Sequence, residues 1–226
     1  MDDRIAGWVL ALAISSTLVF LARRDRRADA VGVTALLLLF VVALATASWL
    51  LESGWQALAP AIGAGAVWLA VQPLLGMKRL SRAEIGLVPP CPGSAGAAIT
   101  ATALGLTANA TIILMRGPAT VAVPVTMVFA VIVAAVVEEL VMRGILLALA
   151  DRASPPRWFL WGARIGAGGL IVTIAFVVLH GLRPGLLLGV APAAMLYLWL
   201  RARTGSLLPP IAAHVLWNLS VVLLHH

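Results

Sequence analysis

Residues 121–144 read VAVPVTMVFAVIVAAVVEELVMRG, an apolar run that ends in the adjacent glutamates Glu138 and Glu139. Arg143 follows four residues after the second glutamate. A carboxylate at the centre of a bilayer costs about 2.5–3.5 kcal/mol even on the mildest insertion scale. Two adjacent carboxylates in such a run therefore require partners, and the stretch predicts a membrane helix built around ionisable groups.

The composition of the whole chain agrees with a lipid environment. Of the 226 residues, 62% are apolar and 11% are charged, whereas soluble domains are about 45–50% apolar and about 25% charged. The mean hydropathy is +1.04. Helices satisfy their own backbone groups in lipid and open sheets do not. The sequence therefore predicts an all-α, polytopic integral membrane helical bundle, with residues 1–226 forming a single membrane domain.

One crossing takes about 20 apolar residues, so the sequence predicts about eight transmembrane helices. The expected spans are 5–22, 31–51, 57–76, 94–115, 121–149, 161–180, 184–200 and 207–224. The fifth span is too long for one straight crossing and is expected to kink. Six of the eight tryptophans lie near expected span ends, as interfacial anchors do, namely Trp8, Trp49, Trp55, Trp158, Trp161 and Trp199.

The basic residues predict the orientation of the helices. Twelve of the sixteen Lys and Arg residues lie in loops on one side, at 23–27, 78–82, 152–164 and 201–203. That bias places these loops in the cytoplasm and predicts a multi-pass protein of a bacterial-type plasma membrane. Because the net charge of +7 is spread between apolar runs, nucleic acid is not an expected partner. Cys91 is the only cysteine, which excludes an intramolecular disulfide.

Residues four apart on a helix share a face, and adjacent residues point about 100° apart. Glu139 and Arg143 are thus expected to form a bidentate ion pair that orders the site. Glu138 points elsewhere, has no cation on its own helix, and is the candidate general base. The alternative is that all three form one structural charge cluster.

Two further pairs have the same spacing. The ring of Phe176 is expected to lie against the imidazole of His180, although a histidine at a helix end is also a common interfacial residue. His214 and Asn218 place two hydrogen-bond donors on one face, as an oxyanion hole requires. A polar clamp between two helices is the alternative for this pair.

Together these residues supply the groups that activate water against a carbonyl and hold the resulting oxyanion. No Ser or Cys has a spacing that pairs it with a base, so water is the expected nucleophile. A zinc site from Glu138, His180 and His214 is a chemical alternative. However, the H-E-x-x-H helix of common zinc proteases is absent and Asn218 is a poor ligand, so no metal or other cofactor is favoured.

The patterns E-E-x-x-x-R, F-x-x-x-H and H-x-x-x-N resemble the motifs of the CAAX prenyl protease type II and bacteriocin-processing family, also called CPBP or Abi. Residues 204–211 (TGSLLPPI) and, more weakly, residues 84–87 (EIGL) are also similar. The resemblance covers roughly 120–222 as a family-like catalytic core, while residues 1–93 match only in being hydrophobic.

The resemblance implies a glutamate-dependent intramembrane endopeptidase. Glu138 with His180 would activate water, His214 with Asn218 would stabilise the oxyanion, and Glu139 with Arg143 would order the site. The implied partners are the lipid bilayer and a peptide or protein substrate, which can itself be membrane-associated. The alternatives are a non-catalytic scaffold or bacteriocin-immunity protein of the same fold, and a proton-coupled transporter.

The proposed site poses a geometric problem, because His180 would lie at the outer tip of a helical hairpin. Straight spanning helices would keep it far from Glu138. We therefore expect the turn at 181–185 to be sunk into the membrane.

Overall fold

The computed structural model describes residues 80–116, 125–180 and 184–224. The expected spans 5–22, 31–51 and 57–76 lie outside the described residues. The prediction of a helical protein is confirmed, and within the described ranges a short two-stranded hairpin is the exception. The elements are α4 (Ala95–Arg116), α5 (Val125–Glu139), the π-helix η1 (Leu140–Leu146), α6 (Leu147–Ala153), β1 (Trp158–Leu160), β2 (Ala163–Ile165), α7 (Ala167–Leu179), α8 (Pro184–Thr204) and α9 (Leu208–Leu224).

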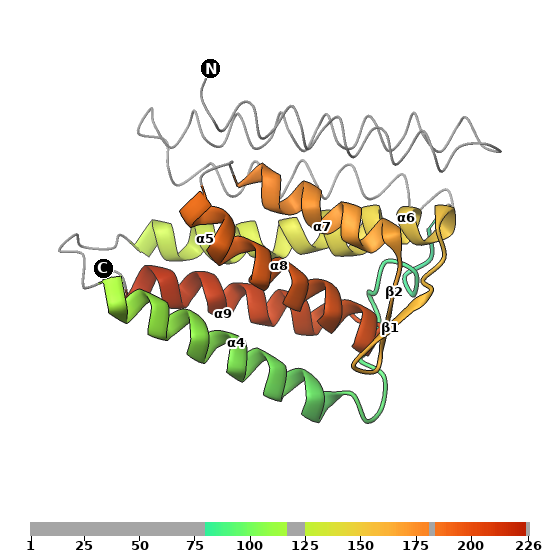
Figure 1. The fold of residues 1–226 in the computed structure, drawn as a ribbon, viewed down its shortest axis with the longest axis horizontal. Helices are drawn as coiled ribbons and strands as arrows, with labels where there is room; N and C mark the ends of the chain where they lie inside the picture. The colour runs from blue at the N-terminus through green and yellow to red at the C-terminus, as the bar shows by residue number, and fades with distance from the viewer. Residues whose placement is uncertain (1–79, 117–124, 181–183, 225–226) are drawn as a thin grey trace, which may run out of the picture.

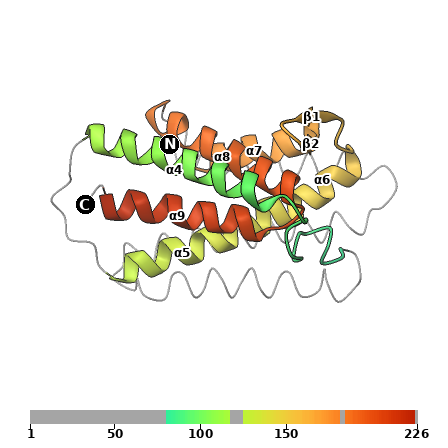
Figure 2. The same cartoon turned by 90° about the horizontal axis from the view of Figure 1, so that it is seen from below.

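The long helices run lengthwise beside one another (Figures 1 and 2). Helix α9 packs against α4, α5 and α8, and α7 packs against α6 and α8. The hairpin and the loop before α4 lie at the same end of the bundle, where α8 ends and α9 begins (Figure 1). In the described part of the chain, one helix, Ala95–Met115, is long and apolar enough to cross a bilayer. Helices α7 and α9 are apolar but shorter.

The expected fifth span, 121–149, changes its winding where the charges lie. Helix α5 ends at Glu139, and the seven-residue π-helix η1 carries Arg143 before α-helical winding resumes in α6. Such π segments inside α-helices are frequent at functional sites. At Gly144 an added Cβ would come within 3.2 Å of Leu207 and 3.3 Å of the Ile85 carbonyl. Glycine therefore lets η1 approach the loop at 80–93 closely.

The prediction that 161–180 forms one continuous helix is wrong over its first residues. Residues 158–165 form an antiparallel hairpin in which Leu160 pairs with Ala163. Its turn residues, Trp161 and Gly162, have φ of 45° and 80°, and two positive φ values are what a two-residue type I′ turn requires. The sequence signal was the Trp-Gly pair between β-forming residues.

The late start of α7 affects the position of His180 along the bundle. Helix α7 starts at Ala167 and has 13 residues, so at ~1.5 Å per residue it is only ~20 Å long. The hydrocarbon core is about 30 Å thick. Because α7 is short, its end can meet the middle of neighbouring helices rather than their tips.

Candidate active site

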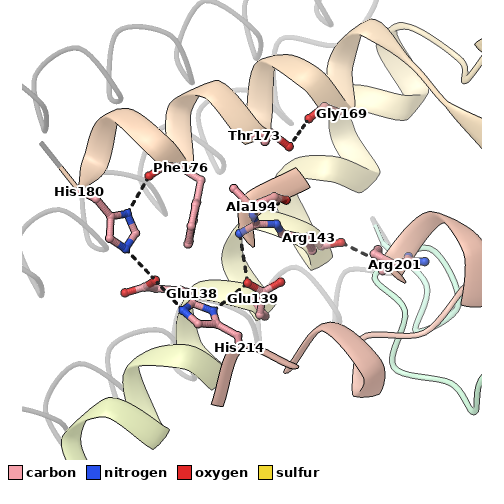
Figure 3. Close-up of polar contacts among 10 residues, drawn as sticks. All are labelled: Glu138, Glu139, Arg143, Gly169, Thr173, Phe176, His180, Ala194, Arg201 and His214. Atoms are coloured by element: carbon pink, nitrogen blue, oxygen red, sulfur yellow. Dashed lines mark hydrogen bonds and ion pairs between the residues drawn. The ribbon is translucent and has the colours of Figure 1, made fainter. Parts of the chain in front are cut away.

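Four ionisable side chains converge from three helices (Figure 3). Glu138 and Glu139 end α5, His180 caps the C-terminus of α7, and His214 lies in α9. Oε2 of Glu138 lies 3.8 Å from Nε2 of His180 and 3.9 Å from Nε2 of His214. Glu138, which the sequence predicts to have no cation on its own helix, thus faces both imidazoles.

The Oε2 atom of Glu138 is buried and has no hydrogen-bond partner among the described residues. Its distances to the two imidazole nitrogens exceed the usual limit for a direct hydrogen bond. They suit a small group held between the carboxylate and the rings, because polar contacts of this length are commonly bridged by water. The side chains of Glu138 and His180 keep 19% and 31% of their surface exposed, so the pair remains accessible.

The hydrogen bonds of the second ring nitrogens define the neutral tautomers of both histidines. Nδ1 of His180 lies 2.9 Å from the Phe176 carbonyl oxygen. A carbonyl only accepts, so Nδ1 carries the hydrogen. Nδ1 of His214 lies 3.0 Å from Oε1 of Glu139, whose ionised form also only accepts. In the neutral state both imidazoles therefore direct the Nε2 lone pair toward Glu138.

Glu139 is fully buried, and its carboxylate connects α5 to η1 and to α9. Its Oε1 accepts from Nη1 of Arg143 at 3.1 Å as well as from His214. The ion pair expected between Glu139 and Arg143 is present, but the prediction that it is bidentate is wrong. The second nitrogen, Nη2 of Arg143, donates instead to the Ala194 carbonyl on α8 at 3.2 Å, because the guanidinium spans the gap between η1 and α8.

Aromatic rings enclose the charges. Phe176 packs against the His180 ring at 4.6 Å between centroids, as the spacing predicts, and the Arg143 guanidinium lies 4.0 Å from the Phe176 centroid. Tyr197 on α8 stacks on His214 at 4.7 Å and 20°. Tyr197, the only tyrosine of the chain, could not be predicted as part of the site, because no spacing rule connects it to His214.

Asn218 is not joined to this cluster. Its Nδ2 donates to the Val131 carbonyl on α5 at 3.4 Å. In the described part of the structure no hydrogen bond connects it with Glu138, His180 or His214. The observed contact has the form of the polar clamp between two helices, and an oxyanion role would require Asn218 to give up this long bond.

The residues named for an alternative zinc site were Glu138, His180 and His214. Two Nε2 lone pairs facing one carboxylate, each with Nδ1 anchored by an acceptor, are a chemically suitable donor set. As the side chains stand, however, no group of three or more His, Cys, Asp or Glu among the described residues is close enough to hold a metal ion.

A helical bundle in which carboxylates and imidazoles converge from several apolar helices fits the class of integral membrane proteins with an internal polar site. Residues 120–220 match the family model described as type II CAAX prenyl endopeptidase Rce1-like. The match supports the CAAX protease family for this region of the chain, and that family is a membrane-integral protease family. No curated protein and no solved structure gives a significant match to the chain.

Proposed function

We propose that this protein is an intramembrane endopeptidase that hydrolyses peptide bonds with water activated by Glu138 and His180. The observation that carries the proposal is the position of the Glu138 carboxylate, 3.8 Å and 3.9 Å from two Nε2 atoms and free of Arg143. A structural charge cluster needs no such carboxylate, since Glu139 already neutralises Arg143. The family match supports a protease.

The first step follows from the two tautomers. A water between Glu138 and His180 donates one hydrogen bond to Oε2 of Glu138 and the other to the Nε2 lone pair of His180. As the water oxygen attacks the carbonyl carbon of the peptide bond, its proton passes to Glu138. Collapse of the tetrahedral intermediate then returns that proton to the leaving nitrogen, and the products are a carboxylic acid and an amine.

In its protonated form, His214 stabilises the oxyanion. Nδ1–H is anchored on Glu139, and a carboxylate in this position stabilises an imidazolium and fixes its orientation, as in hydrolytic triads. The imidazolium then presents Nε2–H, a donor of the kind that stabilises oxyanions. Asn218 is the proposed second donor, after it leaves the Val131 carbonyl.

The proposal includes the setting of the reaction. Residues 120–222 form the catalytic core within a bundle of about eight helices, the basic loops face the cytoplasm of a bacterial-type cell, and the substrate is a peptide or protein that reaches the site from the membrane. The family match supports a peptide substrate, and the proposal does not assign a prenylated tail to it.

A peptide-release assay in proteoliposomes tests the proposal. Wild type is compared with Glu138→Gln and His180→Ala, and with Glu84→Gln as a matched control, since Glu84 is an exposed carboxylate paired with Arg152 away from the site. The proposal expects loss of turnover in the first two variants only. Turnover by Glu138→Gln at the wild-type rate would overturn it. Turnover that a chelator abolishes would assign water activation to a metal instead.

A further inference from the structure

A second polar cavity lies at the hairpin end of the bundle, apart from the proposed hydrolytic site. Its volume is about 230 Å³, and its walls come from α6, β2, the start of α7 and the end of α8. The charged lining residues are Asp151, Arg164 and Arg201. None of them takes part in the proposed hydrolysis.

Asp151 is the unsatisfied group of this cavity. Its Oδ1 is buried and lacks a hydrogen-bond partner among the described residues. Burial raises the pKa of Asp151 from 3.8 to about 6, although the charge of Arg201 opposes this shift. The carboxylate is therefore ionised at neutral pH, and its buried Oδ1 atom lacks the donor that a buried polar atom requires. A cationic N–H donor placed in the cavity would stabilise it.

The two arginines supply the opposite charge. Arg201 is held by the bundle, because Nε donates to the Arg143 carbonyl at 3.3 Å and Nη2 to the Glu84 carbonyl at 2.7 Å. Arg164 is exposed on β2, opposite Phe159. Guanidinium groups bind phosphate well. A ligand that matches all three residues carries a phosphate and an ammonium group a short distance apart.

The neighbouring hairpin indicates where such a ligand comes from. Its aromatic residues project from the protein, with Trp158, Phe159 and Trp161 exposed by 54%, 74% and 82%. The hairpin is fixed to α8 by Nε1 of Trp199, which donates to the Leu160 carbonyl at 3.2 Å. Tryptophan is enriched at the head-group level of membranes, so these rings suit the boundary between head groups and acyl chains.

We infer that this cavity binds the head group of an aminophospholipid from the surrounding leaflet. The ammonium group is bound by Asp151, the phosphodiester by Arg164 and Arg201, and the aromatic residues of the hairpin lie among the lipids beside it. The inference does not rest on the proposed hydrolysis, because it uses none of the same side chains.

Native mass spectrometry of the full chain released from nanodiscs tests the inference. The discs contain equal amounts of phosphatidylethanolamine, phosphatidylcholine and phosphatidylglycerol. All three offer the phosphodiester, but only the first offers ammonium N–H donors. We expect preferential retention of phosphatidylethanolamine. Asp151→Asn should lower that preference about ten-fold, the effect of losing one charge-assisted hydrogen bond.

A variant of Arg164 tests the phosphate contact separately from the ammonium contact that Asp151→Asn removes. Arg164→Ala should weaken retention of all three lipids, because it removes a phosphate contact. Arg157→Ala and Glu84→Gln are the controls, since Arg157 is exposed, Glu84 is half-buried, and neither residue lines the cavity. Thermal unfolding of each variant confirms that it is folded before its lipids are compared.

Equal retention of phosphatidylethanolamine and phosphatidylglycerol by the wild type would overturn the inference, as would an unchanged preference in folded Asp151→Asn. Displacement of the lipid by soluble phosphoethanolamine at equal concentration would show that a free metabolite is the ligand, which also overturns the assignment to a bilayer lipid. Failure of the peptide-release assay would leave these outcomes unaffected.

Discussion

Nδ1 of His214 donates to Oε1 of Glu139 over 3.0 Å, and this bond decides which nitrogen of His214 faces Glu138. The same carboxylate oxygen accepts from Arg143. Glu139 therefore does more than neutralise the arginine. It sets the tautomer of one histidine, while the backbone of Phe176 sets that of the other.

The first prediction concerns these tautomers. In protein labelled with ¹⁵N at histidine, His180 and His214 should both show the Nδ1–H form when neutral, because each Nδ1 has an acceptor. The imidazole ¹⁵N chemical shifts measure this, with His180→Ala and His214→Ala used to assign the signals. An Nε2–H signal from His180 would contradict the way it is proposed to accept a hydrogen bond from water.

The second prediction concerns Glu138. Glu138→Gln keeps the shape of the side chain but cannot accept a proton, so kcat should fall by about 10²–10⁴-fold, the range for a general acid–base group. The melting temperature should change little, since Oε2 of Glu138 has no hydrogen bond to lose among the described residues. A large loss of stability without a specific loss of kcat would indicate a structural role.

The third prediction separates stability from catalysis at Glu139. Glu139→Ala leaves the guanidinium of Arg143 buried without its carboxylate, and breaking a buried pair costs about 3–5 kcal/mol. Replacing both residues together, as Glu139→Met with Arg143→Met, should recover most of that stability. The double variant should remain inactive, because His214 has lost the acceptor for Nδ1–H.

Denaturant unfolding in detergent, combined with the peptide-release assay, measures both effects. If the double variant unfolds as readily as Glu139→Ala, the cost lies in packing around Phe176 and Tyr197 rather than in the stranded charge.

Helical spacing predicted much of this cluster. The i to i+4 rule correctly paired Glu139 with Arg143 and Phe176 with His180, because both contacts are local to one stretch of helix. The rule could not predict the contact of Glu139 with His214, which joins residues 75 apart in sequence. Nor could it predict the stacking of Tyr197 on His214. Those contacts depend on how α8 and α9 pack against α5.

The start of α7 shows a limit of predicting helix bounds from hydropathy. The residues at 158–165 are apolar and aromatic, so hydropathy alone extends the helix over them. The hairpin forms because Gly162 accepts a positive φ and the flanking aromatic residues favour strands. Its formation shortens α7, and His180 at the end of this helix lies 3.8 Å from Glu138. The expected sinking of the turn at 181–185 into the membrane falls largely on residues outside the described ranges.

The fourth prediction tests the two roles of Asn218. As an oxyanion donor it should contribute to kcat, and Asn218→Ala should lower kcat by about 10²–10³-fold. As a clamp between α9 and α5 it should contribute only to stability, and by no more than about 1 kcal/mol for one long neutral hydrogen bond. Separate kcat and KM values, measured beside the melting temperature, distinguish the roles.

The fifth prediction concerns the pH dependence of stability at Asp151. Its pKa is raised from 3.8 to about 6 in the folded protein by burial. Between these values the folded protein keeps a proton that the unfolded chain has released, so stability falls as pH rises from about 4 to about 6 and is level above that. The charge of Arg201 moderates the loss without removing it.

Asp151→Asn should abolish this part of the pH profile, and above about pH 6 the variant should be more stable than the wild type. Thermal unfolding in detergent without aminophospholipid measures the effect, with Glu84→Gln as the control. Adding phosphatidylethanolamine should then stabilise the wild type above about pH 6, where the carboxylate is charged, and should leave Asp151→Asn unchanged. A wild-type profile that matches the variant throughout would mean that Asp151 is already solvated, and that its cavity has no charge for a lipid to neutralise.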